Sequence, residues 1–295
     1  MSNSVAVGAL ETGGTKTRCA MVGASGQIES SVNLPTTSPE QTMGEVAAFF
    51  APYIARDPHL LLGVASFGPV SVNRRAANFG ALTGTPKPGW SGVNLVHRLS
   101  QTLAIEPSRI ALHTDVVAAA LAEAKQISAT TSLAYFTVGT GVGMGWVLEG
   151  KVPPTALHPE AGHLFVPRHP DDTFAGVCPF HNDCLEGLAS GPSMAARWGV
   201  DADLIVEEAA WQMQAWYLAH ACLNAVRILG VNRLVLGGGV MQTEGLLARI
   251  HQQLSELGGD YYLPGAWESC VGLPMLGNDA GLIGAASLAR SLSTT

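Results

Sequence analysis

The residues best suited to chemistry lie in one stretch, from His158 to Gly191. It contains a C-x2-H-x2-C arrangement, Cys178, His181 and Cys184, and a further histidine, His163, fifteen positions before the first cysteine. Two thiolates and two imidazoles form a donor set that zinc takes in tetrahedral structural sites. The segment between them is rich in Pro, Asp and Gly, so a metal ion would have a loop to hold. The alternative is two ordinary thiols and surface histidines, but the spacing favours one structural zinc.

Two carboxylates accompany this cluster, Glu160 before it and Glu186 after it. A metal ion bound between them would fix both side chains relative to each other. The stretch therefore predicts a rigid platform for a polar ligand, rather than a free-standing zinc finger.

A glycine turn near the N-terminus is a candidate phosphate site. The sequence Glu11-Thr-Gly-Gly-Thr-Lys16 separates two apolar runs, which predicts strand, turn, strand. It is not a P-loop, because Gly14 stands where that motif requires lysine. The backbone N–H groups of Gly13 and Gly14 can still face a phosphate, with Thr15 and Lys16 adding a hydroxyl and a charge. The alternative is a hairpin turn without a ligand.

The same layout returns in the middle of the chain. The apolar run 133–138 leads into Gly139-Thr140-Gly141-Val-Gly143 and a second apolar run. The turn is not a dinucleotide fingerprint, because Met144 follows and no helix does. Two halves that each open with a glycine-bent hairpin indicate a duplicated α/β domain with a cleft between the copies.

A third glycine cluster, Gly237-Gly238-Gly239, ends the apolar run 233–236 and precedes a predicted helix over 244–257. A junction of this kind offers N–H groups to phosphate, or lets a flat ring lie close to the backbone.

Asp115 follows a short apolar run, 110–113, and precedes an alanine-rich helical pattern over 116–125. One interpretation is that Asp115 or Thr114 caps that helix. The other is a carboxylate held at a strand end, ready to act as a general base. The two interpretations are compatible.

Hydrophobic periodicity supplies the elements that would position these groups. It predicts further strands over 5–10, 18–22, 60–67 and 145–148, and helices over 42–51, 93–103, 202–229 and from 278 to about 292. The long helix carries an apolar stripe whose aromatic and methionine members are expected in the core or at a dimer face, and the chain is expected to form a homodimer.

Composition excludes several classes of function. The chain has 295 residues, 47% hydrophobic and 13% charged, with a net charge of −7 and no basic run, so a nucleic-acid partner is not expected. No apolar run reaches the roughly 18 residues of a membrane span, and no signal peptide is evident. Cys19, Cys222 and Cys270 lie in apolar surroundings and are expected to be buried thiols. A cytoplasmic, reducing location is expected.

Taken together, these segments resemble the ROK family, and within it the bacterial fructokinases. The resemblance covers nearly the whole chain, and its most specific part is the block from Cys178 to Gly191. The matching segments are Glu11–Lys16, Ser66-Phe-Gly-Pro69, Thr85–Trp90, Thr114-Asp-Val116, Val138–Gly143, His158–His163, Cys178–Gly191 and Gly237–Val240.

The resemblance implies an actin-like ATPase (ribonuclease H-like) fold with two α/β domains closing over sugar and ATP. The expected small domain covers residues 1–115 plus about 277–295, and the expected large domain covers 116–276 with the zinc loop. ATP with magnesium and one structural zinc are the implied cofactors.

The resemblance also implies roles for individual residues. Asp115 would be the base. Thr114, Glu160, His163 and Glu186 would contact the sugar, with His163 also binding zinc. Glu11 would lie near magnesium. The remaining residues would hold ATP, its phosphates or its nucleoside: Gly13, Gly14, Thr15, Lys16, Gly139, Thr140, Gly141, Gly237, Gly238 and Gly239.

One position departs from the family pattern. The family usually has Asn two positions after the catalytic aspartate, and this chain has Val117. Fructokinase-like members commonly carry threonine at the position of Thr114, which supports fructose as the substrate. The alternatives are a kinase for another hexose or an N-acylhexosamine, because the fold does not fix the sugar. A sugar-responsive regulator is disfavoured, because only seven residues precede Gly8 and no basic helix is present.

Overall fold

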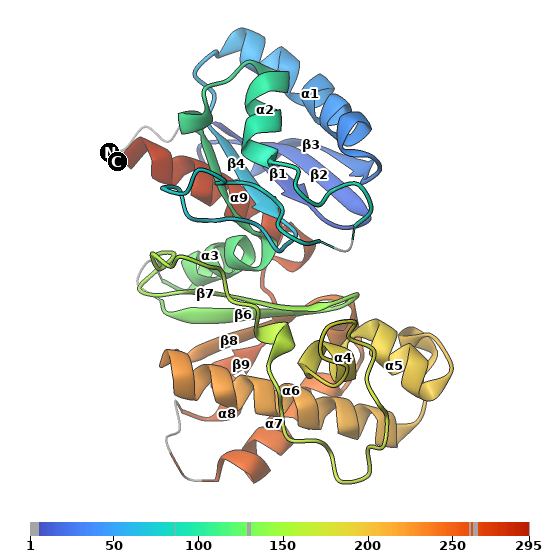
Figure 1. Cartoon of the computed structure of the whole chain (residues 1–295). Coiled ribbons are helices and arrows are strands. Elements are labelled where there is room, and N and C mark those ends of the chain that lie inside the picture. The colour runs from blue at the N-terminus through green and yellow to red at the C-terminus, as the bar shows by residue number, and fades with distance from the viewer. Residues whose placement is uncertain (1–5, 86, 129–130, 260, 262–264, 295) are drawn as a thin grey trace. The chain divides into compact units, whose positions relative to one another are not determined.

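Two mixed β-sheets organise the chain (Figure 1). The computed structural model describes residues 6–85, 87–128, 131–259, 261 and 265–294. The strands are β1 Val7–Thr12, β2 Lys16–Val22, β3 Ile28–Pro35, β4 Leu62–Ser66, β5 Ile110–Thr114, β6 Leu133–Val138, β7 Val142–Val147, β8 Arg233–Gly237 and β9 Val271–Gly272. The α-helices are α1 Pro39–Arg56, α2 Leu95–Leu103, α3 Asp115–Ile127, α4 Leu185–Ala189, α5 Gly191–Trp198, α6 Glu208–Leu229, α7 Leu246–Gly258, α8 Trp267–Cys270 and α9 Ala280–Ser291. Short 3-10 helices lie at Pro107–Arg109, Ala161–His163, Ala202–Leu204, Gly239–Gln242, Gly277–Asp279 and Leu292–Thr294.

The chain divides into two units, each built on one sheet. The first contains the residues up to Ala122, the segment Val152–His158 and the residues from Asn278 onward, and the second contains the rest. The domain boundary expected at residue 115 differs from this division, because the first turns of α3 group with the first unit. The reason is close packing on α9, where a Cβ added to Gly284 would lie 1.9 Å from the Ala118 carbonyl oxygen.

The two sheets repeat one arrangement of strands. In the first unit the order is β3-β2-β1-β4-β5, with β1 antiparallel to β2 and parallel to β4. In the second unit the order is β7-β6-β8-β9, with β6 antiparallel to β7 and parallel to β8. The duplication predicted from the two glycine-bent hairpins is therefore confirmed in the topology of the sheets.

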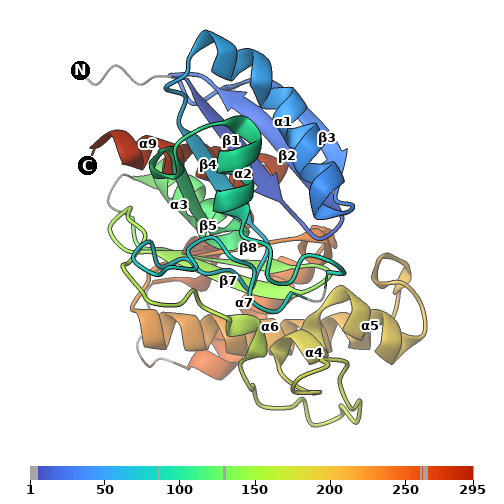
Figure 2. The ribbon, with the colours of Figure 1, turned by 45° about the horizontal axis from the view of Figure 1, so that its top comes forward.

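In the first unit, α1 and α2 lie on one face of the sheet and α9 lies on the other (Figure 2). Successive side chains of a strand point to opposite faces, so the two faces pack differently. Large side chains such as Leu10, Val64 and Leu112 join α1 and α2 in one core. Many of the alternate positions are small, such as Ala9, Gly63 and Ala65, and α9 packs closely over β1 and β4. A Cβ added to Gly63 would lie only 1.7 Å from a carbonyl oxygen of α9, so glycine is required at this crossing.

In the second unit, α6 and α7 pack together and share the core with the sheet (Figure 2). The predicted helix over 202–229 is too long, since α6 begins at Glu208. Residues 202–204 form a separate 3-10 turn, and the Ile205 carbonyl accepts the indole N–H of Trp211. The apolar pattern misled the prediction because Ile205 is buried in the same core without being helical. Among the described residues, no helix combines the length and apolar character needed to cross a membrane.

Candidate active site and metal centre

The predicted site residues fall into two groups, one in each unit. The first group lies at the carboxyl ends of β1, β4 and β5, which run parallel with Thr12, Ser66 and Thr114 in register. The Thr12 hydroxyl donates to Ser66 Oγ at 3.2 Å, which ties two of these strand ends together. Strands lie about 4.8 Å apart, so the turn after β1 and the residue after β5 are separated by two spacings, roughly 10 Å. Ligands of open α/β sheets bind at this kind of edge.

Asp115 is half-buried and is the first residue of α3. One of its carboxylate oxygens accepts the backbone N–H of Val116 at 2.8 Å, a contact that fixes the side chain at the start of the helix. Thr114 is buried, and its backbone N–H donates to Nδ1 of His113 at 2.9 Å. Burial, helped by nearby His158, lowers the pKa of His113 to about 3, so this imidazole is neutral. The base role of Asp115 stays a prediction.

The first glycine turn is closed by one hydrogen bond, from Gly13 N–H to the Lys16 carbonyl at 2.8 Å. Gly14, Thr15 and Lys16 are exposed, and a Cβ added to Gly14 would meet nothing within 4 Å. The turn therefore has open space beside its backbone, as a phosphate-binding turn needs.

Glu11 lies beside this turn, on β1. Burial raises the pKa of its carboxyl, although the charge of Arg18 acts in the opposite direction. Arg18 lies 3.4 Å from Glu11 but forms a closer ion pair, at 2.6 Å, with Asp279. Sequence reasoning missed this arginine, because its partner Asp279 is far away in the sequence.

The second glycine turn is held by the segment that follows the cysteines. Gly139 N–H donates to the Gly141 carbonyl at 2.9 Å, and Gly191 N–H donates to the Gly139 carbonyl at 2.8 Å. Glu186 accepts the backbone N–H of Val142 at 2.9 Å. The predicted sugar contact Glu186 and the predicted phosphate turn are therefore immediate neighbours.

The third glycine cluster lies beside the second, because β6 and β8 are parallel neighbours with Thr137 opposite Gly237. A Cβ added to Gly139 would lie 3.8 Å from the backbone nitrogen of Gly239. Gly238 has a φ of +93°, and a Cβ there would meet the Val138 carbonyl oxygen at 2.3 Å, so only glycine fits. The structure thus brings two of the predicted ATP-binding segments together.

The four predicted metal ligands converge. The ligand atoms of His163, Cys178, His181 and Cys184 all lie within 4.8 Å of one another. Nδ1 of His163 is 3.3 Å from Nδ1 of His181, 3.7 Å from Sγ of Cys178 and 3.5 Å from Sγ of Cys184, and the Cys178–His181 distance is 3.8 Å. Ligand atoms of a tetrahedral zinc with its usual bond lengths are about 3.3–3.8 Å apart. The donor set and its spacing therefore fit zinc.

The backbone around the cysteines is shaped for this convergence. Cys178 and Asn182 exchange backbone hydrogen bonds of 3.1 and 2.9 Å, so the intervening residues form a tight turn. Gly187 is packed so closely that a Cβ would lie 1.9 Å from the Asn182 carbonyl oxygen. With no metal ion, burial raises the pKa of the Cys184 thiol to about 11. Metal binding would therefore displace a proton from this residue.

Glu160, the other predicted sugar contact, is exposed and immediately precedes the 3-10 turn that carries His163. Its carbonyl accepts the His163 backbone N–H at 3.0 Å. Val117 is only 1% exposed, so it packs in the interior of its unit. The three remaining cysteines are buried as predicted, and burial raises the pKa of Cys19 and of Cys222 to about 12.

Comparisons with known proteins agree with this architecture. The ROK family model matches residues 7–291. The fructokinase of Zymomonas mobilis is 37% identical over 290 residues, covering 96% of this chain and 95% of its own length. The fructokinase of Streptococcus mutans is 36% identical over 291 residues, covering 97% of this chain and 98% of its own length. The N-acetylmannosamine kinase of Shigella boydii is 31% identical over 308 residues, covering 96% of this chain and 97% of its own length.

A solved structure shows the same fold. The crystal structure of the ROK hexokinase from Thermus thermophilus matches with a TM-score of 0.78 at 25% identity, covering 98% of this chain and 99% of that one.

Proposed function

Because this chain belongs to the ROK family, we propose that it is an ATP-dependent sugar kinase that converts D-fructose to fructose 6-phosphate. The observation that carries the proposal is the shared edge of the first sheet, where a glycine turn and the Asp115 carboxylate follow parallel strands. The 36% and 37% identity to two fructokinases over almost the full chain supports fructose as the sugar.

Asp115 is the proposed general base. A sugar hydroxyl is a poor nucleophile, and Asp115 accepts its proton as the phosphoryl group is transferred. One carboxylate oxygen is fixed by Val116 N–H, which orients the side chain for this task. Phosphoryl transfer has a loose transition state, so the remaining contribution is positioning and stabilisation of charge. Lys16 and the backbone of Gly13–Thr15 provide this on the phosphate side.

In the second unit, Gly139–Gly141 and Gly237–Gly239 are the proposed phosphate and nucleoside contacts. Glu160, His163 and Glu186 are proposed to hold the sugar hydroxyls. Thr114, in the first unit, is a further proposed sugar contact. Glu11 provides a carboxylate oxygen, the ligand type magnesium prefers, and magnesium bound with ATP would supply positive charge to the phosphates.

The proposed structural zinc is held by His163, Cys178, His181 and Cys184. Four protein ligands close the coordination shell and leave no position for a reactive water. Each histidine ligand atom in the cluster is Nδ1, so Nε2 of His163 remains available for a sugar hydroxyl. Thiol ligands must stay reduced, which fits the proposed cytoplasmic location. A homodimer stays a prediction, to be checked by analytical ultracentrifugation.

A coupled ADP-release assay with fructose, mannose, glucose and N-acetylmannosamine tests the proposed function. We expect the highest kcat/KM with fructose and dependence on magnesium. The second candidate, an N-acylhexosamine kinase, is favoured by the 31% identity to an N-acetylmannosamine kinase. It would be supported if that sugar were phosphorylated fastest. Absence of ADP release with every sugar would refute the kinase assignment.

A further inference from the structure

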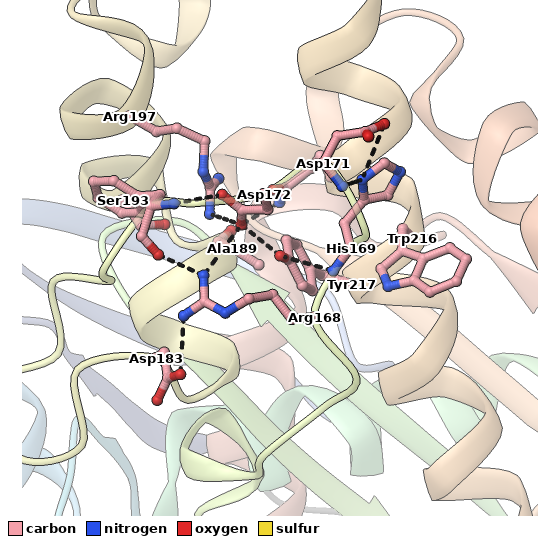
Figure 3. A network of polar contacts seen from close by, with 12 residues as sticks. Arg168, His169, Asp171, Asp172, Asp183, Ala189, Ser193, Arg197, Trp216 and Tyr217 are labelled. Carbon is pink, nitrogen blue, oxygen red and sulfur yellow. Dashed lines mark hydrogen bonds and ion pairs between the residues drawn. The ribbon is translucent and has the colours of Figure 1, made fainter.

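A buried ionic cluster connects the metal loop, here residues 164–184, to helices α5 and α6 (Figure 3). Its centre is the Asp172 carboxylate, whose side chain is only 2% exposed. Arg197 of α5 lies 3.0 Å from this carboxylate, and its own side chain is 8% exposed. The Tyr217 hydroxyl of α6 donates to Asp172, and the backbone N–H of Phe174 donates at 2.9 Å. The cluster therefore joins the middle of the loop to two helices.

Asp172 is held in its charged form. Burial alone would raise its pKa, but the Tyr217 and Phe174 hydrogen bonds and the charges of Arg197 and Arg168 outweigh burial, so the pKa is lowered. The Arg197 guanidinium also lies over the Phe174 ring, 4.7 Å from its centroid. A buried charge with this many partners is costly to separate, so the cluster fixes its part of the loop.

Arg168 connects this cluster to the ligands. One of its terminal nitrogens donates to the Phe174 carbonyl and lies 3.8 Å from Asp172, and the other donates to Asp183 at 2.9 Å. Asp183 immediately precedes the ligand Cys184. The guanidinium of Arg168 thus spans from the fixed middle of the loop to its ligand-bearing end (Figure 3). A planar fork with fixed donors is suited to holding two acceptors in a defined arrangement.

We propose that Arg168 is a positioning residue for the metal site, which holds the Asp183–Cys184 segment in place whether or not a metal ion is bound. This inference rests on the metal site proposed above. Because the ligands are already ordered, binding of the metal ion removes less conformational freedom from the loop. The affinity for the metal ion is therefore higher. The same segment leads directly into Glu186, so Arg168 also supports the proposed sugar contact.

The test is the variant Arg168→Met in the full chain, with Arg249→Met as the matched control. Arg249 also forms a short ion pair in the second unit, at 2.5 Å with Glu208, but it joins α6 and α7 instead of the metal loop. Protein stripped of metal is titrated with zinc against a chromogenic chelator and with cobalt, whose absorption spectrum reports thiolate coordination. Outer contacts of metal ligands typically contribute 10- to 100-fold in affinity, so we expect Arg168→Met to raise the dissociation constant at least about tenfold. The control Arg249→Met should bind zinc and cobalt with the dissociation constants of the wild type.

The variant Asp183→Asn serves if Arg168→Met does not fold, since it weakens only the link to the ligand segment. Asp183→Asn should raise the dissociation constant for zinc. Where Arg168→Met folds, adding Asp183→Asn to it should change that constant little further. If the wild type binds metal and the folded Arg168 and Asp183 variants bind it equally tightly, the inference is overturned and the metal site stands. If the wild type binds neither zinc nor cobalt, the proposed metal site is wrong and the inference falls with it.

Discussion

Replacing Gly141 by alanine is the sharpest test of how the second unit is built. A Cβ at this position would lie 2.7 Å from Oε2 of Glu186, a separation that real Cβ atoms do not show. The carboxylate must retreat by about 0.7 Å to reach the ordinary contact of 3.4 Å. Because Oε2 accepts the Val142 N–H at 2.9 Å, this movement stretches or breaks that hydrogen bond.

The expected magnitude follows from the hydrogen bonds of a charged acceptor. Such a bond contributes about 1.5–3 kcal/mol, and 1.4 kcal/mol corresponds to a factor of about ten in affinity. If Glu186 holds a sugar hydroxyl, its displacement should raise the KM for fructose about tenfold or more. The thermal midpoint should fall by a few degrees at most, because Glu186 is only half-buried and water can replace part of the lost bond.

Gly139→Ala is the matched control, since it adds the same methyl group to the same turn. Its Cβ would have its nearest neighbour at 3.8 Å, an ordinary contact, and neither glycine has a positive φ. KM values for fructose and ATP are measured for both variants in the coupled assay. The control should leave the fructose value within about twofold. An unchanged fructose KM in Gly141→Ala would refute the assignment of Glu186 to the sugar.

Two site residues, Asp115 and Cys178, and the buried His113 can each be tested by substitution. Asp115→Asn should fold and lose at least about 100-fold in kcat with little change in the fructose KM; near-normal turnover would leave this residue as a helix cap. Cys178→Ala should lose its metal ion, measured by elemental analysis, and raise the fructose KM while the ATP KM stays constant; stoichiometric zinc in this variant would contradict the proposed ligand set. Because the pKa of buried His113 is lowered from 6.5 to about 3, the unfolded chain binds a proton more readily. The contribution of neutral His113 to the free energy of unfolding is therefore complete above about pH 6.5. It decreases as the pH falls toward 3, by about 2 kcal/mol between pH 7 and pH 5. Urea unfolding at these two pH values should show this slope, and His113→Asn should flatten it.

Much of the candidate site could be predicted because its residues belong to short local motifs. The glycine turns interrupt apolar runs, and the cysteines and histidines lie at metal-ligand spacing within one short stretch. Strand β3 was missed because it is half-exposed along its length, with alternating intermediate and exposed residues and no buried run. Its less exposed positions are Ile28, Ser30, Val32 and Leu34, of which Val32 and Leu34 pack against the core, and the serine interrupts the apolar–polar alternation that would predict a strand.

The contacts that hold the site could not be predicted from the sequence. Asp172 meets Arg197 and Tyr217, which lie 25 and 45 positions away. A charged side chain has many partners of opposite sign available in a chain of this length, and only the folded arrangement of α5 and α6 selects among them. Val117, two positions after the proposed base Asp115, is buried in the interior of its unit, and its effect on the choice of sugar stays a prediction.

The packing of α9 has a consequence for the order in which the chain folds during synthesis. The first sheet is made early, but the helix that covers one of its faces lies downstream of the entire second unit. At a synthesis rate of about 5–20 residues per second, the nascent first sheet waits roughly ten seconds or more for α9. During that interval the face around Gly63, shaped for a helix backbone at van der Waals distance, remains uncovered. A chain that stops before Ala280 would therefore leave the sheet face around Gly63 uncovered, as a surface that chaperones can bind.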